Sequence, residues 1–146
     1  MTPERAGLIR AHWEALTPAG ARLAEAFVER LFALNPQVRQ RLGPVGGAAL
    51  AEQFGTVAGG LVRRLEAPED LIPELSRLGR RLQELGVSER NYDLLGDALL
   101  TALRTTAGAG WHAELQDAWL EAYTVAASIM KRAGQRVSGA TAIVAG

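Results

Sequence analysis

The sequence predicts an all-α protein with a single domain, and three observations support this prediction. Apolar residues recur at spacings of three and four along most of the chain. Prolines follow helix-capping residues at Thr2-Pro3, Thr17-Pro18 and Asn35-Pro36, where a missing N–H costs a helix nothing. No segment alternates apolar and polar residues over the length of a strand. We therefore expect seven or eight helices of unequal length around the one core that a chain of 146 residues buries.

The first half of the chain predicts four helices. The first runs from Pro3 to about Leu16, the second carries the segment AGARLAEAFVERLFALN, and the third is a short turn that ends near Leu42. The glycine-rich segment GPVGG (43–47) is expected to be a loop, because it cannot sustain a helical backbone. The fourth helix should cover about Ala48 to Leu65, with one buried stripe formed by Leu50, Phe54, Val57, Leu61 and Leu65.

Three further helices are predicted in the second half. Pro68 and Pro73 bracket an irregular entry into a helix that Gly86 ends as a C-terminal cap. Ser88 begins the next helix, and an AGAG turn separates it from the last, which should run from about Trp111 to Ala133. The tail from about Gly134 is small and apolar, so we expect it to pack loosely. The apolar face of the helix before Gly86 carries Leu75, Leu78, Leu82 and Leu85.

Composition excludes several functional classes. Sixteen basic residues balance sixteen acidic ones, so no net positive field attracts nucleic acid or anionic lipid. The chain has no cysteine, which excludes disulfides, thiolate nucleophiles and cysteine-bound metals. No segment approaches the roughly 20 apolar residues of a membrane span, and the N-terminus lacks a signal peptide. We therefore expect a soluble, cytoplasmic protein.

Catalytic and metal-binding patterns are missing as well. His12 and His112 lie outside any spacing that brings metal ligands together, so we interpret both as structural residues. None of the four serines lies in the sharp strand-to-helix turn that exposes a nucleophile. The pairs Arg63-Arg64 and Arg80-Arg81 offer charge for an anion, but a solvated helix face explains them better. These features predict a protein that is not an enzyme and binds no metal.

Three segments nevertheless resemble one family closely. AFVERLFALNPQVRQRL, LGRRLQELGVSERNYDLLGDALL and WHAELQDAWLEAYTVAASIM are similar to segments of bacterial single-domain globins, including the globin half of flavohaemoglobins, and of neuroglobin. The resemblance covers roughly Arg5 to Arg132. It implies a globin fold, with the helices in a three-over-three arrangement.

The resemblance also identifies positions that usually contact haem. Where the family has its proximal histidine, which binds the haem iron, this sequence has Leu82. The distal glutamine or histidine matches Leu50 by a count without gaps, although a shift in the glycine-rich loop brings Gln53 nearer that position. The family tyrosine that stabilises bound oxygen matches Val28, and the phenylalanine that wedges the haem matches Leu42.

These replacements predict a globin without haem. Leucine has no lone pair, so Leu82 cannot coordinate iron. An empty haem-sized void of roughly 300 Å³ would cost on the order of 7 kcal/mol, so side chains or an apolar ligand such as a lipid chain must fill it. We expect no cofactor, and a role as a sensor or interaction module. The former haem pocket should comprise Val28, Phe32, Leu42, Leu50, Phe54, Leu78, Leu82 and Tyr92.

Two alternatives remain open at this stage. In the first, haem binds with Tyr92 as its ligand, and the chain binds oxygen or nitric oxide. In the second, which depends on the first, the chain is a peroxidase or a nitric oxide dioxygenase. Separately, the resemblance implies that the chain can form a homodimer or bind a protein partner, because family members often pair through their last two long helices.

Overall fold

The computed structural model describes residues 1–16, 20–43, 46–107 and 110–145, and the side chains of all these residues except 20, 21 and 136–145. Within these ranges it contains seven α-helices and no strand, which confirms the all-α prediction. In chain order the elements are α1 (Pro3–Leu16), α2 (Gly20–Leu34), α3 (Pro36–Leu42), α4 (Gly46–Arg63), the 3₁₀ turn η2 (Pro68–Leu71), α5 (Ile72–Glu84), the 3₁₀ turn η3 (Glu89–Asn91), α6 (Tyr92–Ala107) and α7 (Ala113–Ala145).

The predicted helix ends are largely confirmed. Pro3 and Pro36 occupy the first positions of α1 and α3, as the capping pattern indicates, while Thr17-Pro18 lies outside the described residues. Gly86 follows α5 with a φ of 92°, a left-handed conformation that glycine adopts without strain. Ser88 then starts the next turn, in a capping box with Asn91.

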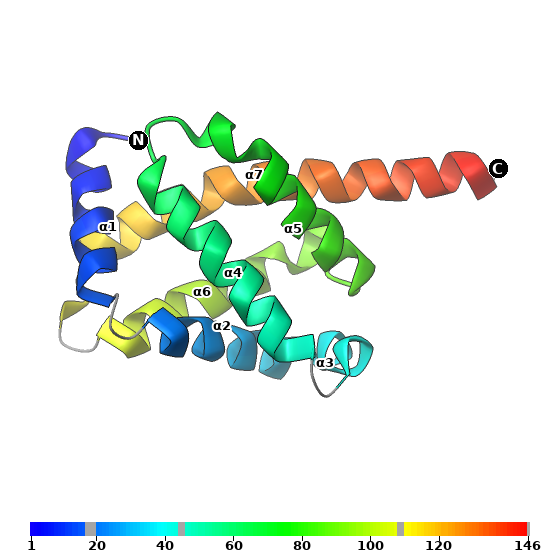
Figure 1. Ribbon diagram of the computed structural model, residues 1–146, viewed down its shortest axis with the longest axis horizontal. Helices are drawn as coiled ribbons and strands as arrows, with labels where there is room; N and C mark the ends of the chain where they lie inside the picture. Colours follow the sequence, from blue (N-terminus) through cyan, green and yellow to red (C-terminus); the bar gives the residue numbers. More distant parts are fainter. Residues whose placement is uncertain (17–19, 44–45, 108–109, 146) are drawn as a thin grey trace.

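Three predicted boundaries are wrong. The fourth helix begins at Gly46 rather than Ala48, and it ends at Arg63 rather than Leu65. A Cβ at position 46 would lie 2.8 Å from the Leu42 Cβ, so glycine lets the first turn of α4 pack closely against α3. The last helix continues to Ala145 rather than ending at Ala133, and its final turns project beyond the other helices (Figure 1). Loose packing of the tail side chains stays a prediction.

The helices adopt the three-over-three globin arrangement that the sequence predicts. The long helix α7 packs along α5 and also contacts α1 and α6, while α2 packs against α6 and α4. Figure 1 shows α4 crossing in front of α6 and α7. Apolar side chains from all seven helices form one continuous core, in which Leu82 and Leu95 are each 2% exposed.

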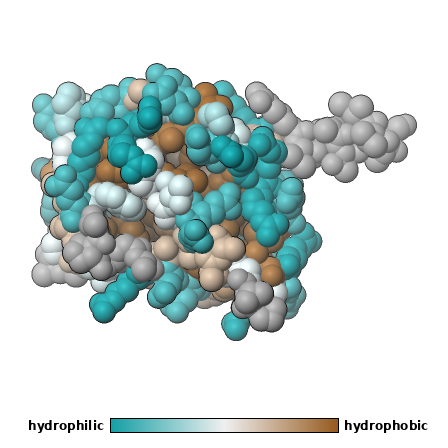
Figure 2. All heavy atoms as spheres, in the orientation of Figure 1, coloured by the Kyte–Doolittle hydropathy of each residue, from teal (hydrophilic) through white to brown (hydrophobic). Residues whose placement is uncertain are grey.

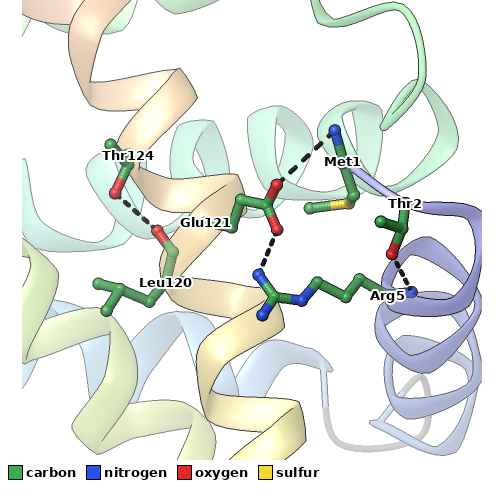
Figure 3. A network of polar contacts seen from close by, with 6 residues as sticks. All are labelled: Met1, Thr2, Arg5, Leu120, Glu121 and Thr124. Atoms are coloured by element: carbon green, nitrogen blue, oxygen red, sulfur yellow. Dashed lines mark hydrogen bonds and ion pairs between the residues drawn. The ribbon is translucent and has the colours of Figure 1, made fainter.

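Ion pairs fix the start of α1 on α7. The Glu121 carboxylate of α7 accepts a hydrogen bond of 2.6 Å from the Arg5 guanidinium and lies 3.6 Å from the Met1 amine (Figure 3). This carboxylate has a pKa below its usual value, because it accepts the hydrogen bond from Arg5. The two helices are therefore held together at the surface, above a cluster of aromatic residues between them.

Candidate functional site

Leu82 faces the interior, as the spacing of leucines along α5 predicts. Its side chain is only 2% exposed, and Leu75, Leu78 and Leu85 on the same face are exposed by 5% or less. The opposite face of α5 carries Arg77, Arg80 and Arg81, which are exposed. Burying the leucine stripe of this strongly amphipathic helix therefore places Leu82 inside the core.

A small cavity lies beside Leu82, between α4, α5, α6, α7 and the middle of α2. It has a volume of about 60 Å³, and the surface that it presents is entirely apolar. At about 24 cal/mol per Å³, an empty cavity of this size costs about 1.4 kcal/mol, which a folded domain tolerates. Its lining residues are Phe27, Leu50, Phe54, Val57, Ala58, Leu61, Leu75, Leu78, Leu82, Leu95, Leu99, Trp119, Tyr123, Ala126 and Met130.

Four of the eight predicted pocket residues line this cavity together. Leu50 and Phe54 reach it from α4, and Leu78 and Leu82 reach it from α5. Leu50 is 3% exposed, whereas Gln53 lies in a hollow at the protein surface with Glu52 and Thr56. Of the two residues considered for the distal position, Leu50 therefore lines the cavity and Gln53 does not.

Val28, Phe32 and Leu42, three of the other predicted residues, do not line the cavity. Val28 lines a surface hollow between α2 and α4, and Phe32 lines a neighbouring hollow near Arg39. A Cβ at Gly47 would lie 3.4 Å from the Phe32 ring, and one at Gly46 would meet Leu42. Phe32 and Leu42 therefore pack against the first turn of α4 rather than against the cavity.

Tyr92, the fourth predicted residue outside the cavity, is buried at the start of α6. Its side chain is 3% exposed, and burial raises its pKa to about 12. The Lys131 ammonium lies 5.5 Å from the centre of its ring, and its backbone carbonyl accepts a hydrogen bond of 2.5 Å from the Tyr123 hydroxyl. Tyr92 therefore packs beside Lys131 and does not face the cavity.

Three of the remaining cavity residues, Val57, Leu61 and Leu75, lie on the helix stripes that the sequence predicts to be core. Val57 and Leu61 belong to the predicted stripe of α4, and Trp119, Tyr123, Ala126 and Met130 lie on one face of α7. Helical periodicity shows that such residues are buried, but it does not show which of them face a common space. Phe27 is an example, because its ring stacks on Phe54 with the ring centres 3.9 Å apart.

The cavity lining does not fit a haem bound through histidine. Among the described residues that line it there is no histidine, and of the side chains that ligate haem iron in proteins it includes only Met130 and Tyr123. Tyr123 donates its hydroxyl hydrogen to the Tyr92 carbonyl, and its pKa is raised by burial. The thioether of Met130 is therefore the one available donor among the lining residues.

Each of the two histidines accepts a hydrogen bond from a neighbouring group. Nδ1 of His12 accepts a hydrogen bond of 2.9 Å from the Trp119 indole nitrogen, while its Nε2 is buried without a partner among the described residues. Burial lowers the pKa of His12. Nδ1 of His112 accepts a hydrogen bond from the Leu115 backbone N–H at the start of α7. Across the described ranges, no cluster of three or more histidine, aspartate or glutamate side chains is arranged to hold a metal ion.

One helical domain with an apolar space between α4 and α5 defines the class as globin-like. The family model for globins matches residues 25–130, so the chain belongs to the globin family. Nothing in the described part of the chain forms a helix long and apolar enough to cross a membrane.

Relatives support this assignment. The chain is 26% identical over 132 residues to the flavohemoprotein of Bordetella parapertussis, matching 89% of this chain and 33% of that protein. It is 27% identical over 145 residues to neuroglobin-1 of Oncorhynchus mykiss, matching 90% of this chain and 91% of the relative. The chain thus spans about a third of the length of the flavohemoproteins that it matches. An engineered carbene transferase from Rhodothermus marinus shares the fold, with a TM-score of 0.85, 20% identity and coverage of 97% and 99% of the two chains.

Proposed function

We propose that this chain is a haem-independent globin that acts as a sensor or interaction module. The observation that carries the proposal is the cavity itself, which presents a wholly apolar surface and is lined by Leu82, the residue that the resemblance matches to the family's iron ligand. No lining side chain offers a nitrogen lone pair, so a bound haem would lack the ordinary proximal ligand.

The size of the cavity supports the same proposal. Pockets for small molecules usually have volumes of about 300–1,000 Å³, whereas this cavity measures about 60 Å³. Admitting a porphyrin would require Leu50, Phe54 and Leu82 to leave a packed arrangement in which Leu50 and Leu82 are almost completely buried. Such repacking costs free energy, and no iron–histidine bond forms to compensate for that cost.

Haem binding with an unusual ligand is the second candidate. The similarity to a flavohemoprotein favours this candidate. The thioether of Met130 in the cavity lining favours it as well, since methionine ligates iron in some haem proteins. Tyr92 serves this candidate poorly, because it lies outside the cavity and its pKa is raised to about 12. Any enzymatic activity of this chain would require that it binds haem. Our proposal for the chain is therefore a non-enzymatic role.

Spectroscopy of the purified protein tests the proposal directly. We expect a folded, colourless protein that gives no sharp absorbance band near 400 nm, roughly where haem absorbs, before or after hemin is added. Stoichiometric haem recovered from cells grown with iron would overturn the proposal.

Leu82→His is the informative variant, because it restores an imidazole while Leu50 still supplies no hydrogen bond to bound oxygen. We expect hemin binding without reversible oxygen binding.

We also propose that the module pairs with a second copy through α6 and α7. Leu120 and Val125 of α7 are 44% and 41% exposed, and Leu120 lines a surface hollow with Asp97 and Arg104 of α6. These residues offer apolar area and charges of both signs, as a two-fold contact between identical faces requires. Sedimentation of the parent and of Leu120→Glu tests this, with a monomeric parent contradicting it.

A further inference from the structure

The interior cavity offers water few hydrogen-bond partners. Trp119 and Tyr123 bring the N–H and O–H donors of its described lining, and each donor already has an acceptor. The Trp119 indole donates to His12, and the Tyr123 hydroxyl donates to the Tyr92 carbonyl. A buried water needs two to four polar partners, so water gains nothing by entering. The cavity therefore selects against water and against any ligand that needs hydrogen bonds.

The volume of the cavity limits the size of a ligand. An engineered cavity of about 150 Å³ lined by similar aliphatic and aromatic side chains stays dry and binds benzene or xenon. The cavity beside Leu82 has a volume of about 60 Å³. It is thus large enough for one compact apolar molecule but smaller than a cavity that takes benzene.

Val57 lies between the cavity and the protein surface. This side chain lines the cavity and also a surface hollow of about 460 Å³ between α4 and α5. Glu74 and Arg77 stand at that hollow, and one carboxylate oxygen of Glu74 is buried there without a hydrogen-bond partner. In the view of Figure 2, apolar atoms are visible at the middle of the face that α4 crosses, bordered by hydrophilic residues. A neutral solute passes such a rim more easily than a charged one, which must lose its hydration.

We propose that the cavity binds a compact, uncharged, apolar molecule smaller than benzene, which enters past Val57 between α4 and α5. This inference rests on the proposed function, because a haem in the same space would exclude the ligand. The ligand fills the void between Leu50, Leu78 and Leu82. The binding energy comes from its van der Waals contacts with these apolar side chains.

Xenon is the probe that tests this inference, with methyl resonances of leucine, valine and methionine as the readout. We expect saturable shifts confined to cavity residues in the parent. Ala58→Ile fills the cavity from α4 and should weaken xenon binding at least tenfold. Ala51→Ile is the matched control, since Ala51 is a partly buried alanine of the same helix that lies outside the cavity, and it should bind xenon like the parent.

A parent without saturable shifts, or an Ala58→Ile variant that binds as well as Ala51→Ile, would overturn the inference. Leu82→Ala decides the question if Ala58→Ile fails to fold. This truncation enlarges the cavity, so it should bind benzene while the parent does not, and failure to bind benzene would count against the inference. Hemin titration of the same samples separates the two proposals. A haem-free protein that does not bind xenon would contradict this inference but not the proposed function. Stoichiometric haem would contradict the proposed function itself.

Discussion

The two sides of α5 differ in how closely they meet their neighbours. Against α7, the backbones touch at Gly79, where a Cβ would lie 2.7 Å from the Cα of Met130. Towards α4, the side chains of Leu78 and Leu82 end at the cavity. One helix thus combines a contact that tolerates no added atom with a contact that leaves space unfilled, and this difference predicts where a substitution will cost most.

The largest effect is expected at the close contact. Gly79→Ala places a methyl group against the backbone of α7, which cannot rotate away as a side chain can. We expect a loss of about 4 kcal/mol in the free energy of unfolding, above the usual range of about 1–3 kcal/mol for overpacking, because the added atom meets backbone. Gly55→Ala is the matched control in α4, because no atom lies within 4 Å of its added Cβ. Denaturant unfolding should find this control neutral or more stable by about 0.5–1 kcal/mol, and equal losses in both variants would contradict a close crossing.

A smaller loss is expected on the cavity side. Leu82→Ala enlarges an existing void, so the free energy of unfolding should fall by about 3 kcal/mol, within the range of about 2–5 kcal/mol for buried Leu→Ala changes. Thermal unfolding should be measured together with mass spectrometry of any small molecule that copurifies. If an apolar ligand fills the cavity in the parent, the loss should be smaller and ligand retention should change. A variant as stable as the parent, with nothing bound to either, would contradict the burial of Leu82.

The smallest effect is expected at the contact of α1 with α7. Burial lowers the pKa of His12 from 6.5, so the unfolded chain takes up its proton at a higher pH than the folded protein. The contribution of His12 to the free energy of unfolding should therefore be fully present well above pH 6.5 and fall as the pH drops below that value. The fall should be less than about 1 kcal/mol, because the residue is partly exposed.

Urea unfolding between pH 8 and pH 5.5 measures this effect of His12. Glu66, whose pKa is lowered to about 2 by its hydrogen bond with Arg10, loses its proton well below that window and does not interfere. His12→Gln keeps an acceptor for the Trp119 indole without titrating, so its stability should change less with pH. An identical pH dependence in this variant and the parent would assign the effect to another group.

Sequence periodicity predicted the helices well, because their ends depend on nearby residues. Pro3, Pro36 and Gly86 mark helix ends through their own backbone preferences, which neighbouring helices need not reinforce. The leucine stripe of α5 likewise follows from spacing alone, and so the burial of Leu82 was predictable. The helical turn at Gly46 and the extension of α7 to Ala145 were missed, the first because it depends on a close contact with Leu42.

The candidate site was predictable only in part, since its shape depends on how helices distant in sequence meet. The sequence by itself determined that Leu82 has no lone pair and that its face of α5 is apolar. Only the tertiary structure decided that Leu50 and Phe54 share a cavity with Leu82, while Val28 and Leu42 lie outside it. The physical reason is that periodicity fixes which face of a helix is buried, whereas the packing of α4 against α2 and α3 fixes which buried side chains surround the same space.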